Sequence, residues 1–347
     1  MTEHETVQEM IRQQEVNAAN TILEVSMTYA VPRCLHVIAE MGIADALGDD
    51  PRTAADLAVS TGANAEAVAR ALRLVSAYGI FELRNDVDGH KGFTHTPASR
   101  LLRTDHPHSM RSFVRMIGNH LNWKTFELLD HSIRTGKSAV EQITPGGAWK
   151  YYAEHPEEGR IFDEAMTGKA QGQIAGILSG YDFSPFKTIA DIGGGRGHLL
   201  QAVLGATPNA RGVLFDQPHV VKDAAGTASA RLELQGGDFF NDTLPVCDAY
   251  LIMQVIHDWN DQESVKILSA IRRSAPAHAK LLIIEGILPE NPSSNWIAML
   301  DILMLALITG KERTRREFEI LLTSSGFRLD KVIEVGLGTS IIEASTI

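Results

Sequence analysis

A histidine at the end of an apolar run has the clearest chemical potential in this sequence. Residues 249–256 are almost all apolar, and His257 follows them directly. A buried strand that ends in this way presents an imidazole at the edge of its sheet. Because an unperturbed histidine has a pKa of about 6.5, close to neutral pH, it suits general-base catalysis. The alternative is a histidine that caps the next helix, but Asn260 and Glu263 already have the spacing of a capping box.

The glycine-rich stretch "ADIGGGRGHLL" (residues 190–200) predicts a ligand-binding turn. Gly193 and Gly195 allow a tight turn and a close approach of ligand to backbone. A dinucleotide fingerprint would need a glycine where His198 stands. Asp191 precedes the first glycine by two residues, where its carboxylate would repel a pyrophosphate and favour a ligand with a cationic end. S-adenosylmethionine (SAM) fits this site, because it carries an ammonium and a sulfonium and has no phosphate.

Two further acids follow the next two expected strands. Asp216 ends the second strand, where a carboxylate can accept hydrogen bonds from both ribose hydroxyls. Asp238 follows the third strand and can accept the adenine amino group, with Phe239 against the ring. The alternative is that both acids only cap helices. Acids at three successive strand ends, together with the glycine loop, predict a SAM site.

Short apolar runs alternate with helical segments from residue 187 onward, which predicts a doubly wound, mostly parallel α/β sheet. Ligands of such sheets bind outside the carboxyl ends of the strands, where the strand order reverses. The strand before His257 is expected beside the strand before the glycine loop, so the imidazole should lie next to the cofactor. Two final strands, at 328–336 and 339–346, are expected to form an antiparallel hairpin at the sheet edge.

The N-terminal third has a different pattern. Residues 5–47 carry apolar side chains at helical spacing. Two short helices around Gly62 follow, and then strands near 80–84 and 92–96 joined by "NDVDG", which is the winged-helix pattern. We predict a first domain at 1–105 and a second at 106–347, the latter with a helical substrate-pocket and linker part (106–180) and a Rossmann-like core (181–347). Because residues 5–47 carry more apolar surface than so small a domain can bury, we predict a homodimer.

Composition narrows the partners and the compartment. The chain has 347 residues and a net charge of −11, which disfavours nucleic acid or an anionic membrane as partner. The apolar stretch at 296–308 is shorter than the ~20 residues of a membrane span, and the first residues have no signal-peptide pattern. Cys34 and Cys247 lie far apart without metal-ligand spacing, which predicts free thiols in the cytoplasm and no metal.

Six segments together resemble a known family: "DIGGGRGHLL", "LFDQPHV", "GGDFF", "IHDWND", "IIEGILPE" and "GKERTRREFEILLTSSGF". In this order they are similar to the caffeic-acid-type, metal-independent O-methyltransferases, which include plant phenylpropanoid enzymes, the animal acetylserotonin enzyme and bacterial tailoring enzymes. The resemblance covers nearly the whole chain. It implies a winged-helix dimerisation domain joined to a seven-stranded methyltransferase domain, SAM as methyl donor and S-adenosylhomocysteine (SAH) as product.

The resemblance also implies roles for single residues. His257 corresponds to the family's catalytic base, and Glu285 and Glu312 correspond to two glutamates that flank and orient the imidazole. Met253 is a departure, because many members carry a lysine near the cofactor at this position. The expected acceptor is a hydroxyl of a small aromatic molecule, since a phenol, with a pKa of ~10, ionises more readily than an alcohol.

Candidates for the acceptor pocket lie before the sheet and after its fifth strand, and each is more readily a core residue: Trp149, Phe162, Met166, Trp296, Met299, Asp301 and Met304. Their methionine and tryptophan content favours a flat aromatic acceptor, although methionine is also a common gap filler. The alternatives are a winged-helix transcription regulator and a SAM-binding relative with other chemistry.

Overall fold

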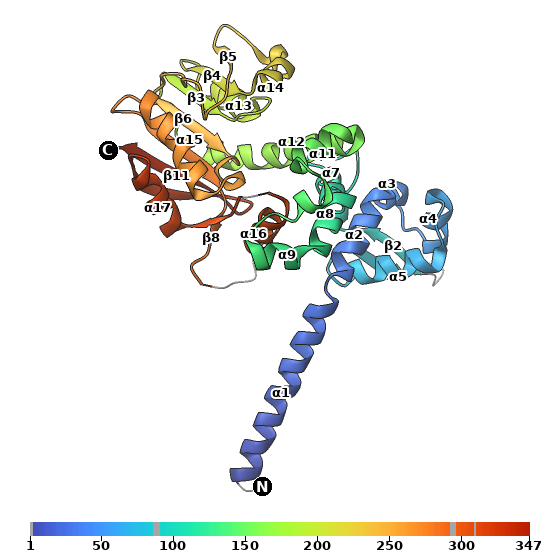
Figure 1. Cartoon of the computed structure of the whole chain (residues 1–347). Helices are drawn as coiled ribbons and strands as arrows, with labels where there is room; N and C mark the ends of the chain where they lie inside the picture. Colours follow the sequence, from blue (N-terminus) through green and yellow to red (C-terminus); the bar gives the residue numbers. More distant parts are fainter. Residues whose placement is uncertain (1–2, 86–90, 292–295, 309) are drawn as a thin grey trace. The chain divides into compact units, whose positions relative to one another are not determined.

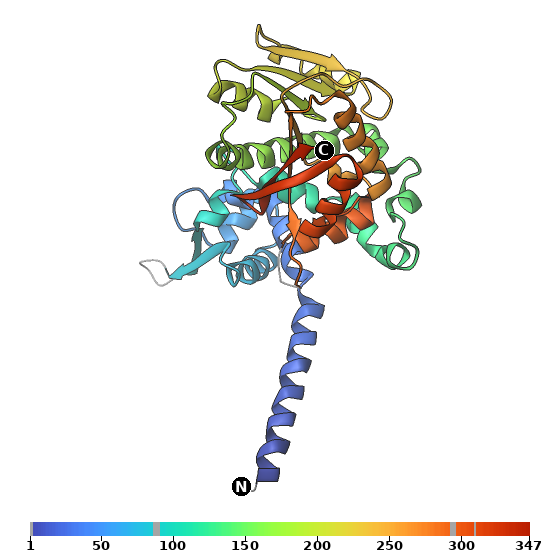
Figure 2. The same ribbon diagram turned by 90° about the vertical axis from the view of Figure 1, so that its left-hand side faces the viewer.

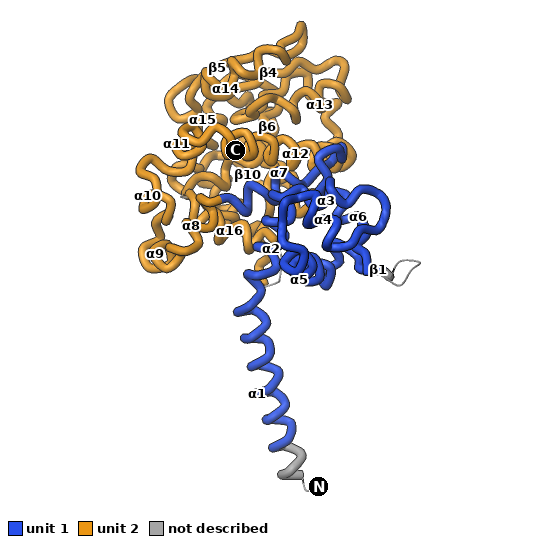
Figure 3. Tube along the Cα trace, turned by 90° about the vertical axis from the view of Figure 1, so that its right-hand side faces the viewer, with its two compact units in different colours: residues 1–119 blue, residues 120–347 orange. Residues whose placement is uncertain are grey.

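The computed structural model describes residues 3–85, 91–291, 296–308 and 310–347. The chain divides into two compact units, residues 1–119 and 120–347 (Figure 3). These units divide after Asn119, later than the domain boundary predicted after residue 105, which stays a prediction.

The first unit is mostly helical and carries one small antiparallel sheet (Figure 1). Its elements are α1 (Glu3–Met27), α2 (Ala30–Glu40), α3 (Ile43–Leu47), α4 (Ala54–Thr61), α5 (Ala65–Ser76), β1 (Phe81–Asn85), β2 (Lys91–His95), α6 (Pro97–Arg100) and α7 (Arg111–Ile117). Thr53 caps α4 in a capping box, and the side chain of Asn64 caps α5. Two helices and a strand pair therefore follow one another as expected, while the predicted turn at 85–89 falls, beyond Asn85, outside the described residues.

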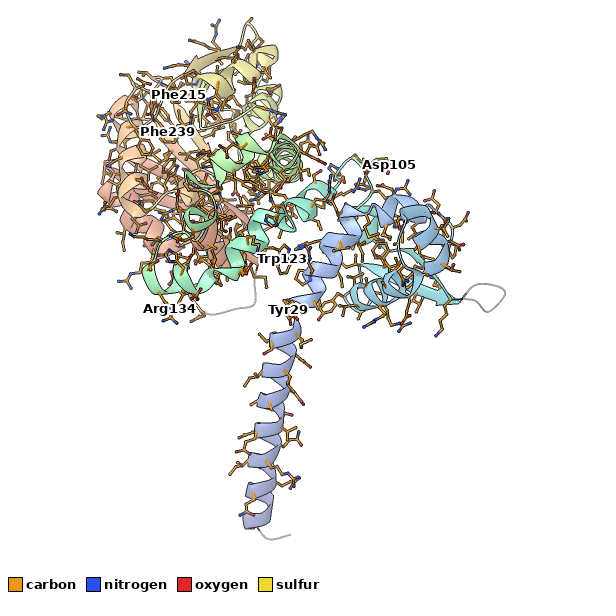
Figure 4. All side chains as sticks on the ribbon, turned by 45° about the vertical axis from the view of Figure 1, so that its right-hand side comes forward. Tyr29, Asp105, Trp123, Arg134, Phe215 and Phe239 are labelled. Atoms are coloured by element: carbon orange, nitrogen blue, oxygen red, sulfur yellow. The ribbon has the colours of Figure 1, made fainter. Side chains whose placement is uncertain are left out.

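Helix α1 is far more exposed than the rest of the first unit. Leu57, Leu72 and Phe81 are at most 1% exposed and belong to its core. In α1, by contrast, Ile22 and Val25 are 67% and 70% exposed. This helix projects from the rest of its unit, and Tyr29 marks its junction with α2 (Figure 4). An exposed apolar helix of this kind is typical of a surface that a second protein chain covers.

Residues 8–40 also have the length and apolar composition of a membrane-crossing helix, with 17% of the apolar window buried. The apolar stretch at 296–308 is shorter, and most of it forms the apolar helix α16 (Trp296–Leu307). Length and composition alone do not separate a membrane helix from a helix covered by another subunit.

A seven-stranded sheet forms the centre of the second unit, in the order β10-β11-β7-β6-β3-β4-β5. The strands are β3 (Thr188–Ile192), β4 (Arg211–Asp216), β5 (Leu232–Gly236), β6 (Ala249–Met253), β7 (Lys280–Glu285), β10 (Phe327–Gly336) and β11 (Thr339–Thr346). Strands β3 to β7 run parallel, and the β10–β11 hairpin, red in Figure 2, joins them antiparallel at one edge. The predicted Rossmann-like sheet, with β6 beside β3, is confirmed.

Helices precede and cover this sheet. Before it stand α8 (His120–Glu127), α9 (Leu129–Thr135), α10 (Val140–Ile143), α11 (Gly147–Glu154) and α12 (Pro156–Gly180). Between and after the strands lie α13 (His198–Ala206), α14 (Pro218–Asp223), α15 (Asp261–Ser274), α16 and α17 (Arg315–Ser324). Successive residues of a strand point to opposite faces of the sheet, and each face packs against its own hydrophobic cluster: Leu251 lies in one and Ile252 in the other. Because both faces are buried, the strand sequences are continuously apolar.

Candidate active site

His257 lies at a sharp bend after β6. Gln254 has a φ of 54°, a left-handed conformation that non-glycine residues rarely adopt. A single 3-10 turn, Ile256–Asp258, then carries His257, which is 7% exposed. The next helix, α15, has Asn260 as its N-cap, with the side-chain oxygen 3.0 Å from the amide of Glu263. His257 therefore does not cap α15, so capping does not explain its position at the end of β6.

Glu312 contacts the imidazole directly. Its Oε1 lies 2.7 Å from Nδ1 of His257, and Glu312 is 2% exposed. The short parallel strands β8 (Ile287–Leu288) and β9 (Arg313–Thr314) bring this segment beside the end of β7. A glycine is required at Gly310, since a methyl group there would come within 1.9 Å of the carbonyl oxygen of His257. With Nδ1 donating to the Glu312 carboxylate, Nε2 is the nitrogen left for proton transfer.

Glu285 holds the backbone and not the ring. This residue ends β7 and is fully buried. Its Oε1 accepts hydrogen bonds from the backbone amides of Val255 and His257, each at 3.1 Å. The resemblance implies that Glu285 and Glu312 both flank the imidazole, whereas the contact of Glu285 is with the turn that carries it. Burial, the largest influence, raises the pKa of Glu285 to about 7.

Charge around His257 raises its pKa well above the unperturbed value of 6.5. Burial lowers the pKa, but the charge of Asp258, the hydrogen bond to Glu312 and the charge of Glu285 outweigh burial and bring it to about 9. Asp258 is the nearest of these to Nε2, with Oδ1 at 3.5 Å. In the protein without ligand, the pKa of His257 therefore lies well above the unperturbed value from which the sequence argument started.

Arg313 was missed by the sequence analysis and fixes the same turn. Its side chain is fully buried. Nη1 donates to the carbonyl of Ile256 at 3.1 Å, and Nη2 donates to the carbonyl of Trp259 at 2.8 Å. Nε donates to Asp261 at 3.0 Å. The guanidinium therefore holds the backbone on both sides of His257, and no local pattern in the sequence indicates contacts over such a span.

Lys169, also missed, brings a second cation to the site. It lies on α12, and its Nζ donates to Oε1 of Gln254 at 2.5 Å and lies 5.7 Å from the ring centre of Trp296. Burial lowers the pKa of Lys169, and the charges of Glu312, Asp258 and Glu285 oppose that effect. The ammonium is thus within electrostatic reach of all three carboxylates around His257.

The glycine loop and the first two acids form a separate cluster. Gly193 and Gly195 have φ values of 70° and 59°, and the amide of Gly195 donates to Oδ2 of Asp216 at 2.8 Å. Asp191 is 1% exposed, and its carboxylate oxygens have no hydrogen-bond partner of ordinary geometry among the described residues, although the nearby backbone amide of Leu200 favours their charge. Burial, and then the charge of Asp216, raise the pKa of Asp191 to about 7. A buried carboxyl group without a partner fits a ligand that brings a cationic donor, as the ammonium of SAM does.

Asp238, which follows the third strand, forms hydrogen bonds within its own turn. Oδ1 of Asp238 accepts from the amide of Phe240 at 2.9 Å, and Oδ2 accepts from the side chain of Asn241 at 2.7 Å. Phe239, labelled in Figure 4, packs edge to face against Trp259 with ring centres 5.9 Å apart. Each oxygen of Asp238 retains a second lone pair, so the local turn leaves room for a further donor. Met253, half-buried, ends β6 on the core face shared with β3.

Two acceptor-pocket candidates on α12 share a helix face. Phe162, Met166 and Lys169 are spaced by four and three residues, so their side chains follow one another along this face. Trp149, 58% exposed, lies edge to face with Phe162 at 5.5 Å between ring centres. The cation–ring contact of Lys169 brings Trp296 to the same helix.

Three of the acceptor-pocket candidates on α16 differ in their contacts and in their exposure. Oδ1 of Asp301 accepts from the amide of Glu312 at 2.8 Å, so Asp301 positions the residue that contacts the imidazole. Met304 is 9% exposed and packs as a core residue. Met299 is 67% exposed. Among the described residues, no group of three His, Cys, Asp or Glu side chains is arranged to hold a metal ion.

Comparison with known proteins gives matches over both units. A family model described as an O-methyltransferase domain matches residues 126–328, and one described as an O-methyltransferase dimerisation domain matches residues 23–105. The chain is similar to the phenazine O-methyltransferase PhzM of Lysobacter antibioticus, with 40% identity over 96% of this chain and 97% of the relative. It is also similar to the mitomycin biosynthesis 6-O-methyltransferase of Streptomyces lavendulae, with 34% identity over 88% of each.

Solved structures give the same result. The chain is similar to the calicheamicin-biosynthesis methyltransferase CalO1 in its SAH-bound form, with a TM-score of 0.86 and 32% identity. The match covers 96% of this chain and 99% of that one.

Proposed function

We propose a specific reaction on the premise that this chain belongs to the O-methyltransferase family and uses SAM. In this reaction a methyl group passes to a hydroxyl of a small aromatic molecule in secondary metabolism, and His257 acts as the general base. One observation carries the proposal: a buried imidazole stands at the end of β6, beside β3 and its glycine loop, with Nδ1 held 2.7 Å from a buried carboxylate.

The proposed proton transfer follows from the contacts of the ring. Glu312 fixes the imidazole through Nδ1, so Nε2 receives the proton of the acceptor hydroxyl. When bound, SAM supplies an electrophilic methyl group on a sulfonium; the products are the methyl ether, SAH and one proton, which His257 passes to water. Glu285 and Arg313 act as positioning residues, because both hold the backbone of the turn and neither contacts the reacting atoms.

The raised pKa of His257 sets a condition on this mechanism. An imidazole with a pKa of about 9 is protonated at pH 7 and cannot take a proton. Positive charge placed beside it lowers the pKa, so binding of a cationic donor leaves more of the imidazole unprotonated at pH 7 and able to accept a proton. An acceptor that binds already ionised would also allow the reaction. A phenolate beside a protonated imidazole carries the same number of protons as a phenol beside a neutral imidazole.

We further propose how the cofactor residues act. Asp191 receives the ammonium of SAM, which would give its two unpartnered oxygens donors. Asp216 accepts the ribose hydroxyls, Asp238 the adenine amino group, and Phe239 lies against the adenine. Gly193 and Gly195 allow the loop to approach the ligand, and Met253 lines the donor site from the end of β6. The position of each group at a strand end or in the loop supports these assignments.

For the acceptor pocket we propose the α12 face and α16. Phe162, Met166 and Trp149 offer rings and a thioether to a flat acceptor, and Met299 and Asp301 border it from α16. The aromatic contacts of Phe162 with Trp149 support this grouping.

The sequence and the matched dimerisation domain support a homodimeric protein in the cytoplasm. The exposed apolar residues of α1 would then be covered by the second subunit, and the helix–helix–hairpin segment would serve as a winged-helix dimerisation domain. A net charge of −11 argues against a nucleic-acid or anionic-membrane partner.

A methyl-transfer screen tests the reaction. The purified protein is incubated with methyl-labelled SAM and a panel of phenols, hydroxyquinones and hydroxypyrroles, and products are identified by mass spectrometry. We expect an O-methylated product and equimolar SAH. A protein that binds SAM but methylates no member of the panel would instead fit the alternative of a SAM-binding relative with other chemistry.

A further inference from the structure

We propose that Lys169 selects an acceptor that carries an anionic oxygen group in addition to the hydroxyl to be methylated. This inference rests on the proposed function and narrows its substrate class. Lys169 is a specificity-determining residue in this proposal, and it takes no part in the proton transfer.

The position of Lys169 supports this role. It follows Phe162 and Met166 along one face of α12, one turn further toward the C-terminus of the helix. One turn beyond it, the side chain of Gln173 donates to Thr339 in β11 and anchors the same face to the sheet. The ammonium therefore stands on a fixed helix, at the end of a row of side chains suited to an aromatic ring.

The ammonium is held in place by a neutral group. Nζ donates to Oε1 of Gln254, whose left-handed backbone lies between β6 and the turn of His257. A non-glycine residue in this conformation is strained, and such strain gathers at sites where it positions a functional group. The amide of Gln254 orients Lys169 but does not neutralise its charge.

The contrast with Arg313 shows that the charge of Lys169 is available. Arg313 is more deeply buried than the half-buried Lys169, but it forms an ion pair with Asp261 at 2.9 Å. Lys169 forms no ion pair with any carboxylate among the described residues, and its second contact is the ring of Trp296. Because no carboxylate pairs directly with this ammonium, an anion bound there gains a charge-assisted hydrogen bond.

The acidic surroundings explain why a cation is needed for such an acceptor. Asp258, Glu285 and Glu312 surround His257, and an anionic substrate would be repelled by them. Lys169, whose pKa responds to all three, offers the compensating charge on the helix that faces the ring of Trp296. An acceptor with its ring along the α12 face and its anionic group at Nζ would bring its hydroxyl toward His257.

A different explanation is that Lys169 only balances the acidic cluster and adjusts the base strength of His257. In that case Lys169→Met would change kcat on neutral and anionic acceptors alike and shift the pH–rate profile. If Lys169 binds an anion of the acceptor, the variant raises KM for anionic acceptors far more than for their neutral partners, whatever change in kcat the two share.

The test measures methyl transfer to matched acceptor pairs. One arm compares hydroxynaphthoates, with the carboxylate at each ring position, with the corresponding carboxamides. A second arm compares a dihydroxynaphthoquinone, in which one hydroxyl ionises readily and the other remains to be methylated, with the corresponding dihydroxynaphthalene. The arms separate a carboxylate from an ionised quinone oxygen as the source of the anionic group. The proteins are the wild type, Lys169→Met, Lys169→Arg and the control Lys150→Met, which removes a lysine of the exposed Lys150–Glu154 pair on α11.

We expect the wild type and Lys150→Met to prefer the anionic member of one pair by about 10- to 100-fold in KM, the range of one hydrogen bond to a charged group. Lys169→Met should lose this preference, and Lys169→Arg should keep part of it. Equal use of both members by the wild type, or a preference that survives in Lys169→Met, overturns the inference and leaves the proposed function standing. Methylation of none of the compounds overturns both.

Discussion

The two halves of the site, one around His257 and one around the glycine loop, differ in how far the protein satisfies its own buried charges. Around His257, Glu312 binds the ring, Glu285 binds the backbone amides and Arg313 binds the carbonyls on either side. Around the glycine loop, Asp191 is as deeply buried but has no partner for either oxygen among the described residues. The turn that carries His257 is thus held by groups within the chain, whereas the carboxyl group of Asp191 fits a ligand that brings the missing donor.

Because of this difference, substitutions in the two halves should affect different measured quantities. Changes near the proposed base should alter turnover or folding, whether or not ligand is present, because the contacts that hold the turn of His257 come from the chain itself. Changes near the glycine loop should act mainly on ligand affinity and on how stability depends on ligand and pH. Four substitutions test this division.

The largest effect is expected from His257→Ala. Removing the base should lower turnover by a factor of ~10²–10⁴ and leave SAM affinity little changed, because the imidazole is outside the glycine-loop cluster. Steady-state kinetics and calorimetry measure the two quantities. The matched control is His278→Ala, which removes an exposed histidine paired with Asp248 and should leave turnover intact. Full activity in His257→Ala would reject the assignment of the base.

Arg313→Met should be the most destabilising of the four. The substitution keeps bulk but leaves the carbonyls of Ile256 and Trp259 without their donor, at a cost on the order of 3–5 kcal/mol in the free energy of unfolding. Chemical denaturation measures this loss. Arg315→Met, two residues later, breaks only an exposed pair with Glu319 and should cost less than about 1 kcal/mol. Equal stability of the two variants would show that Arg313 does not hold the turn.

The part of the site that the sequence predicted is the part governed by local rules. Asp191, Asp216 and His257 were found because strand ends can be recognised from short apolar runs, and parallel strands bring those ends to one edge. The seven-stranded sheet and its edge hairpin were predicted for the same reason.

The missed residues act over long separations in the chain. Arg313 reaches a carbonyl 57 residues away, and Lys169 reaches a side chain 85 residues away. The raised pKa of His257 was also missed, although Asp258 adjoins it in the sequence, because the opposing effects of burial and of the distant Glu285 and Glu312 are set only in the folded chain. The role of Asp301 also needed the fold, since its contact is with the backbone of Glu312 and has no side-chain signature in the sequence.

On the glycine-loop side, Asp216→Ala should chiefly weaken SAM binding. The loss of two hydrogen bonds to a charged acceptor is worth on the order of 2–5 kcal/mol, and the loop also loses the contact of the Gly195 amide. Calorimetry measures the affinity, and turnover at saturating SAM should change far less. Asp216→Asn retains one oxygen acceptor and should lie between the variant and the wild type. Unaltered affinity in Asp216→Ala would overturn the ribose role.

Asp191→Asn should change stability by less than Arg313→Met does, and with opposite signs in the free and the ligand-bound protein. The pKa of Asp191 is raised to about 7 from 3.8, so its carboxyl group favours the folded state at low pH and loses this contribution as the pH rises toward 7. Without ligand, the asparagine variant should therefore gain stability over the wild type as the pH rises from 5 to 8, by on the order of 2–4 kcal/mol. With SAM the order should reverse, because the ionised carboxylate binds the ammonium and the amide cannot replace its charge.

Thermal melts across this pH range, with and without SAM, measure both signs. The matched control is Asp223→Asn on the exposed end of α14, which should follow the wild type at every pH. A variant that is destabilised at pH 8 without ligand would mean that Asp191 already has a partner within the protein. The buried carboxyl group of Asp191 would then be hydrogen-bonded within the protein, as Glu312 is to His257. The two halves of the site would no longer differ in this respect.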